Sequence, residues 1–155
     1  MTAWRSLDQA YGVLPPGGGT LLNVFGNEFR LKVGGADSHG AVALIVAAFA
    51  PGTGAPPHLH RGHDECFYVL DGTFRFRVGD DLVEAGRGGF CFAPRDAAHG
   101  FDNVGDGAGS LLGVIAPAGY EEHFVEIGNL PPGQATPEVL AEIFRRYDQE
   151  PVPPL

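Results

Sequence analysis

GTGAPPHLHRGHDECFYVLDG, at residues 52–72, and GGFCFAPRDAAHGFDN, at residues 88–103, decide the predicted fold of this chain. Both stretches place glycine or proline around short apolar runs, which is typical of strands joined by turns. In the first stretch a single residue separates His58 from His60. Because side chains alternate along an extended segment, both imidazoles are expected on the same face.

A carboxylate and a third imidazole could join this pair. Glu65 begins the next strand after a bend at residues 61–62, and His99 opens a later strand. If a barrel brings His99 close, three imidazoles and one carboxylate could fill four positions of an octahedron and leave two open for substrate or dioxygen. This donor set is typical of a divalent transition metal site and does not distinguish Fe, Mn, Co, Ni, Cu and Zn. We therefore expect one such ion per chain, of undetermined identity.

The composition of the 155-residue chain predicts a single strand-rich domain. Its 24 glycines and 13 prolines fall between short apolar runs, and 44% of the residues are hydrophobic. A disordered chain of this glycine and proline content would lack so many hydrophobic residues. We expect one domain over residues 1–155, with a barrel over about residues 20–117 and a helical cap over about residues 118–155.

The charge of the chain excludes some classes of partner. A net charge of −9 and a single lysine argue against nucleic acid or an anionic membrane surface, since both need clustered cationic side chains. No segment approaches the ~20 apolar residues of a membrane span, and the N-terminus lacks the apolar stretch of a signal peptide. We expect a cytoplasmic protein with a small-molecule substrate.

The segment TFRFRV, at residues 73–78, alternates between apolar side chains on one face and polar side chains on the other. Turn signals flank it, DG at residues 71–72 and GD at residues 79–80. We therefore predict a meander of three antiparallel strands over residues 65–84.

The last part of the chain predicts two short helices. Apolar side chains recur at helical spacing from Tyr120 to Ile127, with acidic residues at the start and Gly128 at the end. Thr136 is expected to cap a second helix that begins at Pro137. The proline-rich ending of the chain cannot be helical.

The spacing G-x5-H-x-H-x4-E-x6-G, followed by G-x5-P-x4-H-x3-N, is similar to the paired motifs of the cupin superfamily. This resemblance implies an all-β fold, a double-stranded β-helix or jelly-roll barrel with short C-terminal helices. It also implies that four residues bind the metal: His58, His60, Glu65 and His99. The chain departs from the pattern at Asp96, where the second motif usually has glycine. Because aspartate tolerates left-handed backbone, the turn can be kept.

Within the cupins, the chain resembles the small single-domain group similar to quercetin 2,3-dioxygenases. The likeness is carried by the first motif, by AGYEEHF at residues 118–124 and by RYDQEPVPPL at residues 146–155. It implies a metal-dependent dioxygenase that acts on a flavonol-like or other enolisable aromatic substrate. Glu65 would then also accept the proton of a substrate hydroxyl.

Alternation along the strands predicts the lining of the substrate pocket. An apolar lining suits a flat aromatic or enol better than a phosphorylated sugar, which needs cationic side chains. The residues expected to line the pocket are Phe67, Val69, Phe92, Phe101, Asn103 and His123.

Two other functions stay open from the sequence. One is a metal-dependent isomerase, decarboxylase or cyclase that works without dioxygen, and the other is a barrel that binds a small molecule without turnover. The strands expected over residues 20–33 could cross to a partner, and the resemblance implies a homodimer.

The remaining histidines and the cysteines receive structural interpretations. His63 is interpreted as a solvated residue of the turn, and His39 as a surface loop residue. Cys66 and Cys91 are interpreted as reduced, buried side chains without a chemical role. His123, on the apolar face of the first predicted helix, is expected to pack there and to face the pocket.

Overall fold

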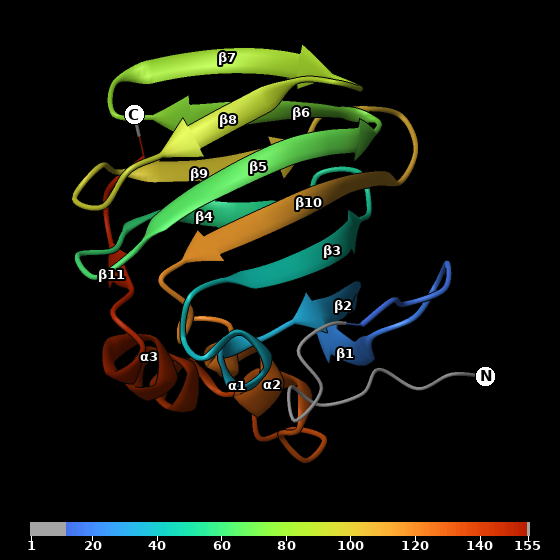
Figure 1. The fold of residues 1–155 in the computed structure, drawn as a ribbon. Coiled ribbons are helices and arrows are strands. Elements are labelled where there is room, and N and C mark those ends of the chain that lie inside the picture. Colours follow the sequence, from blue (N-terminus) through green and yellow to red (C-terminus); the bar gives the residue numbers. More distant parts are fainter. Residues whose placement is uncertain (1–11, 155) are drawn as a thin grey trace.

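The computed structural model describes residues 12–154, which form two antiparallel sheets and three short helices (Figure 1). The first sheet contains, in spatial order, β1 (Thr20–Val24), β2 (Asn27–Val33), β3 (Ala43–Phe49), β10 (Gly109–Ala116), β5 (Asp64–Asp71) and β8 (Phe90–Ala93). The second contains β11 (Glu150–Pro151), β4 (Gly54–Leu59), β9 (His99–Asn103), β6 (Thr73–Val78) and β7 (Asp81–Gly86). The helices are α1 (Gly35–Ser38), α2 (Glu122–Gly128) and α3 (Pro137–Arg146).

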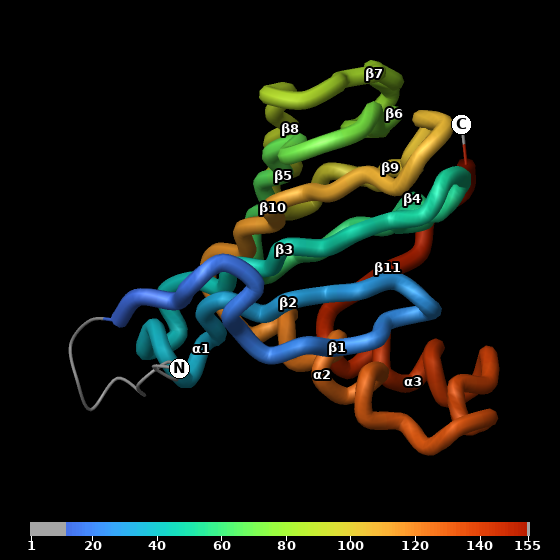
Figure 2. The backbone as a smooth tube through the Cα atoms, turned by 90° about the vertical axis from the view of Figure 1, so that its right-hand side faces the viewer, coloured from blue at the N-terminus to red at the C-terminus, as the bar shows by residue number. Residues whose placement is uncertain are grey.

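The two sheets form the walls of a barrel, and α2 and α3 lie together at one end of it, next to the β1–β2 hairpin (Figure 2). This arrangement confirms the expected all-β barrel with short C-terminal helices. The cavity described below extends from the barrel to these helices.

Apolar side chains from both sheets fill the barrel. Phe74 of β6 and Val69 of β5 are fully buried, and Leu111 of β10 is 1% exposed. Phe74 meets Phe49 of β3 edge to face, with 6.0 Å between the ring centroids. The alternation predicted for β6 is confirmed, since Phe74 and Phe76 are buried while the polar residues that flank them are half-buried.

The predicted meander over residues 65–84 is partly wrong. β6 and β7 do form a hairpin, but β5 pairs with β10 and β8, and β6 belongs to the other sheet. The chain crosses between the sheets at Gly72, where φ is +83° and an added Cβ would lie 2.8 Å from the Cα of Gly109. A DG turn signal specifies a sharp bend, but it does not specify which strand becomes the partner after the bend.

The C-terminal helices agree with expectation to within two residues. Thr136 caps α3 by accepting a hydrogen bond from the backbone N–H of Val139, and Pro137 is its first residue. α2 begins at Glu122 and includes Gly128. The buried carboxylate of Glu121, at the start of α2, accepts hydrogen bonds from the backbone N–H groups of Gly35 and Gly119, and so ties α2 to α1.

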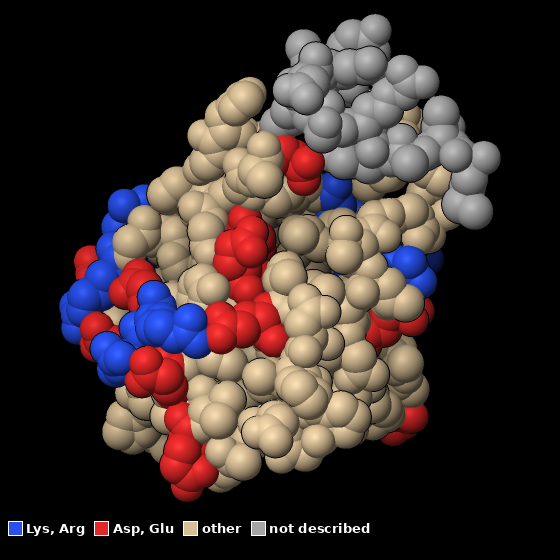
Figure 3. Space-filling model, turned by 90° about the horizontal axis from the view of Figure 1, so that it is seen from below, with Lys and Arg blue, Asp and Glu red and all other residues tan. Residues whose placement is uncertain are grey.

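Charges on the helical end are mixed. Figure 3 shows basic and acidic side chains side by side on the flank where α3 lies. α3 contributes ion pairs of this kind, Arg145 with Glu142 at 2.9 Å and Arg146 with Glu126 at 2.5 Å. Among residues 12–154, no helix is long and apolar enough to cross a membrane.

Candidate metal centre

Four side chains from three strands and one loop meet inside the barrel. His58 is the next-to-last residue of β4, and His60 directly follows that strand. Glu65 lies on β5, and His99 is the first residue of β9. One donor atom from each lies within 4.8 Å of the donor atoms of the other three, and all four side chains are buried. The shortest distances join Oε2 of Glu65 to Nε2 of His99, at 2.8 Å, and to Nε2 of His60, at 3.3 Å.

Backbone carbonyls orient all three imidazoles. Nδ1 of His58 lies 2.7 Å from the carbonyl oxygen of Pro56, Nδ1 of His60 lies 2.8 Å from that of Asp148, and Nδ1 of His99 lies 3.0 Å from that of Ala97. Because a carbonyl oxygen only accepts hydrogen bonds, each Nδ1 is the donor, and each Nε2 is left for the interior of the cluster. Such outer hydrogen bonds are typical of histidines that bind metal ions.

The electrostatics of the cluster favour a cation. Burial alone would raise the pKa of Glu65, but the attraction of His60 and His99 outweighs burial and holds that pKa below its ordinary value. Burial alone would lower the pKa of His99, but Glu65 raises it. For His58, burial and then the neighbouring His99 lower the pKa to about 4. The carboxylate that stabilises a proton on His99 would equally stabilise a metal cation between the four donors.

An unpaired atom provides a direct test of whether these residues fit a metal ion. Nε2 of His60 is buried and has no hydrogen-bond partner, although it faces the carboxylate of Glu65. Leaving a buried polar atom unpaired is unfavourable, and coordination of a cation would satisfy it. Imidazole and carboxylate donors at these separations therefore suit one divalent transition metal ion.

His63 is placed differently from the solvated position expected of it. The side chain is 6% exposed and stacks on Tyr120, with 4.6 Å between ring centroids. Burial, and then the neighbouring His60, lower the pKa of His63 to about 4. It also groups with His60 and Asp148, but it lines a smaller pocket at the protein surface and not the cavity beside Glu65. The expectation failed because Tyr120, distant in sequence, covers the turn. His39 is exposed, as expected.

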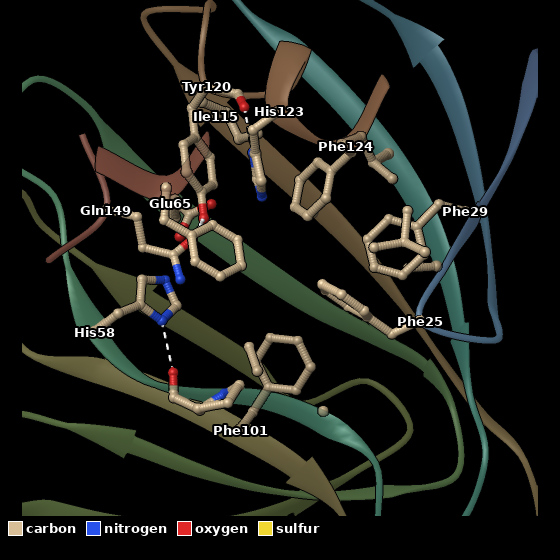
Figure 4. A pocket seen from close by; sticks show the side chains of 18 of the residues that line it. Phe25, Phe29, His58, Glu65, Phe101, Ile115, Tyr120, His123, Phe124 and Gln149 are labelled. Carbon is tan, nitrogen blue, oxygen red and sulfur yellow. Dashed lines mark hydrogen bonds between the residues drawn. The ribbon is translucent and has the colours of Figure 1, made fainter. Parts of the chain in front are cut away.

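A cavity of about 860 Å³ leads from the His/Glu cluster toward the helical end. Figure 4 shows His58 and Glu65 at one side and aromatic side chains around the remaining space. Of the six residues predicted to line the pocket, Phe67, Phe101 and His123 do so. Burial lowers the pKa of His123 to about 4, so this imidazole is neutral at physiological pH.

The other three predicted pocket residues lie elsewhere. Phe92 is 51% exposed, because β8 turns Cys91 and Ala93 inward and Phe90 and Phe92 outward. Val69 points into the core and is not among the residues lining the cavity. Side chains do alternate between the two faces of each strand, as predicted. Counting along a strand, however, shows neither which face points inward nor how far along the barrel a residue lies.

Asn103 is the third of these, and its role is structural. Its amide donates to the carbonyl oxygens of Phe49 and Gly107, both at 2.9 Å, and its oxygen accepts from the N–H of Gly105.

The predictions for the cysteines and for Asp96 can also be compared with the structure. Cys91 is buried as expected, while Cys66 is half-buried. Asp96 has φ +67°, so the backbone expected at this departure from the motif is confirmed.

The cavity lining also includes residues that were not anticipated from the sequence, among them Tyr120, Gln149 and Phe25. Tyr120 is buried beside His60, and its hydroxyl donates to Oε1 of Gln149 at 2.5 Å. Phe25 lies in the turn between β1 and β2 and also lines the cavity. Phe25 lies outside the segments that carry the family likeness, whereas Gln149 lies in the one at residues 146–155. Tyr120 precedes His123 at helical spacing, a weak signal that both could share a site.

The comparisons with known sequences agree with this geometry. Residues 45–115 match the model of the cupin domain family. Quercetin 2,3-dioxygenase of Aspergillus japonicus is 30% identical over 107 residues. The match covers 64% of this chain and 30% of the Aspergillus enzyme, so this chain corresponds to less than a third of that enzyme's length.

Solved structures share the fold. A predicted oxalate decarboxylase from Thermotoga maritima aligns with a TM-score of 0.62 and 23% identity, over 68% of this chain and 99% of that chain. An RmlC-like cupin from Shewanella frigidimarina aligns with a TM-score of 0.59 and 19% identity, over 70% of this chain and 93% of that one. At these identities the likeness concerns the fold alone.

Proposed function

Because residues 45–115 form a cupin domain and its barrel encloses a buried cluster of three histidines and one glutamate, we propose that the protein is a metal-dependent dioxygenase. Its substrate would be a flavonol-like or other enolisable aromatic molecule. The observation that carries this proposal is the position of the cluster at one side of an aromatic cavity of about 860 Å³, a volume that suits a molecule of several rings. The 30% identity to a quercetin 2,3-dioxygenase supports the choice of reaction.

His58, His60, Glu65 and His99 would hold one divalent transition metal ion. When bound, such an ion would act as a Lewis acid on an enol or phenol oxygen of the substrate and as the site for dioxygen. The chain orients three of the ligands through backbone carbonyls and supplies the negative charge through Glu65.

The protein's own residues would prepare the substrate. Glu65 borders the cavity, so its carboxylate lies where it could accept the hydroxyl proton of an enol. Phe67 and Phe101, 5.1 Å apart between centroids, would pack against the ring nearest the metal and exclude water. Among the described residues that line the cavity, Arg145 is the one with a cationic side chain, which disfavours a phosphorylated sugar.

One observation favours a second candidate, an isomerase, decarboxylase or cyclase that needs no dioxygen. The neutral imidazole of His123 borders the same cavity as the carboxylate of Glu65. Two groups that accept or donate protons in one cavity could move a proton between two positions of a bound enol. A barrel that binds its ligand without turnover is the remaining alternative.

Oxygen uptake tests the proposal. Metal-loaded protein would be offered quercetin, other flavonols and simple enediols in an oxygen electrode, with His60→Ala beside it. His39→Ala, at an exposed histidine, is the matched control. Uptake in the wild type and in His39→Ala, but not in His60→Ala, is the expected result. Turnover of the same substrates without dioxygen would favour the second candidate, and substrate binding without any product would favour the binding barrel.

We also propose a homodimer, supported by the outer face of the first sheet. Two rows of paired residues run across β8, β5, β10 and β3, and neither contains a charged side chain. The rows are Phe90, Tyr68, Leu112 and Val46, and Phe92, Cys66, Val114 and Leu44. The aromatic members are 44–61% exposed, and apolar patches of this kind commonly mark interfaces. Light scattering that finds a monodisperse monomer would contradict this proposal.

A further inference from the structure

The turn between β1 and β2 places a phenylalanine where the backbone does not favour one. Val24 pairs with Asn27, so Phe25 and Gly26 form a two-residue hairpin loop. Both have positive φ, +54° at Phe25 and +82° at Gly26, as in a type I′ turn. Asparagine or glycine is the common residue at the first of these positions, because a bulky side chain is strained in left-handed backbone.

Packing in the core does not explain why phenylalanine occupies this position of the turn. Its side chain is 56% exposed, so the strained backbone is not offset by burial of the ring. The turn is held by another group, since the side-chain oxygen of Asn23 accepts a hydrogen bond from the N–H of Gly26 at 3.0 Å. The hairpin would therefore close without an aromatic ring at position 25.

The ring of Phe25 lines the cavity that begins at His58 and Glu65 of the His/Glu cluster. Figure 4 shows it projecting from the hairpin toward Phe101, with Phe29 and Phe124 nearby. Phe29 and Phe124 are themselves 4.9 Å apart between centroids and continue the aromatic wall. Arg145, which also lines the cavity, is bound to both carboxylate oxygens of Glu142, at 2.9 Å and 3.0 Å.

We propose that Phe25 is a substrate-contacting residue that packs on an apolar ring of the ligand while the oxygens of the same molecule face the His/Glu cluster. The ligand is therefore a molecule of at least two parts: an oxygen-bearing end and a flat, uncharged ring held by Phe25, Phe29 and Phe124. The position of the ligand's oxygens at the His/Glu cluster rests on the proposed function. The contact with Phe25 does not depend on whether the bound molecule reacts with dioxygen.

Two ligands test the two ends of the cavity separately. Quercetin carries chelating oxygens together with a second ring system, whereas catechol carries two chelating oxygens on a single ring. Their dissociation constants would be measured without dioxygen on the full-length, metal-loaded protein. In Phe25→Asn we expect quercetin to bind about tenfold more weakly, while catechol binds as in the wild type. Phe25→Tyr, which keeps the ring, should bind quercetin like the wild type.

The melting temperature provides a second measurement, because it is not expected to fall when quercetin binding weakens. Because asparagine suits left-handed backbone better than phenylalanine, Phe25→Asn should melt at the same temperature as the wild type or higher. Leu21→Ala is the matched control, since Leu21 is 54% exposed on the same hairpin and does not line the cavity. It should leave both dissociation constants unchanged.

Three outcomes would overturn the inference. They are unchanged quercetin binding by Phe25→Asn at any melting temperature, an equal loss of catechol and quercetin binding, and no quercetin binding by the wild type. Phe25-dependent binding of quercetin without oxygen uptake would instead reject the proposed dioxygenase and leave the role of Phe25 in place.

Discussion

The imidazole of His60 donates from Nδ1 to the backbone carbonyl of Asp148, 88 residues further along the chain, at 2.8 Å. The carboxylate of Asp148 accepts hydrogen bonds from the N–H groups of Arg61 and Gly62, at 2.9 Å and 2.7 Å. Arg61 in turn binds both carboxylate oxygens of Glu150. The C-terminal segment therefore holds the turn that carries one of the four candidate ligands, while the other two histidines are oriented by carbonyls two residues away.

Removing the Asp148 carboxylate is expected to weaken metal binding. Asp148→Gly keeps the left-handed backbone, where φ is +61°, but loses both hydrogen bonds to the turn. Residues that orient a metal-binding side chain contribute to the affinity for the metal, so the metal dissociation constant should rise about tenfold. Isothermal titration calorimetry would measure it, with Asp106→Gly, in an exposed loop, as control. Equal affinities of the two variants would show that the segment has no positioning role.

Metal ions should stabilise the folded protein through Glu65. An ion that binds only the folded state at about 100 times its dissociation constant adds about 2.7 kcal/mol to the free energy of unfolding. Glu65→Gln keeps the shape of the side chain but removes its charge, so the shift in melting temperature on adding Mn²⁺, Fe²⁺, Co²⁺, Ni²⁺, Cu²⁺ or Zn²⁺ should largely disappear. Thermal unfolding with and without a chelator measures the shift. If the shift stayed as large in Glu65→Gln, the ion would be binding outside this cluster.

Gly54 is predicted to tolerate no side chain. An added Cβ would lie 2.0 Å from the carbonyl oxygen of Phe101, so β4 and β9 would have to separate where Gly54 faces Asp102. We expect Gly54→Ala to lower the free energy of unfolding by about 3 kcal/mol or more. Urea unfolding would show the loss. Gly107→Ala is the control, because an added Cβ there meets nothing within 4 Å. Similar stability of both variants would mean that the strands can separate without cost.

Acid should destabilise the protein partly through His123. Burial lowers its pKa from 6.5 to about 4, so between these pH values the unfolded chain takes up a proton that the folded protein does not. This residue should have no effect on stability well above pH 6.5. As the pH falls from 6.5 to 4, it should lower the free energy of unfolding by about 3 kcal/mol.

Urea unfolding of metal-free protein at several pH values between 4 and 8 tests this expectation. The acid-induced loss should be smaller in His123→Gln than in the wild type, and unchanged in His39→Gln, at an exposed histidine. His58 and His63 have similarly lowered pKa values and contribute with the same sign, so the slope will decrease in His123→Gln without vanishing. An unchanged slope would show that His123 is protonated equally in both states.

The sequence by itself determined the features that depend on neighbouring residues. The alternation in β6, the cap at Thr136 and the left-handed turn at Asp96 each follow from side chains a few positions apart. The spacing of His58 and His60 likewise predicted a shared face, and the motifs predicted the all-β barrel. Local sterics, hydrogen bonding and the two-residue period of a strand are enough for such inferences.

The tertiary structure alone decided which segments meet. It paired β5 with β10 and β8 instead of β6, buried His63 beneath Tyr120 and turned Phe92 outward. It also brought Asp148 to His60 and the hairpin residue Phe25 to the cavity. These contacts join residues far apart in the chain, and which of many apolar segments become neighbours depends on the packing of the whole barrel. Spacing within a motif carries no information about that choice.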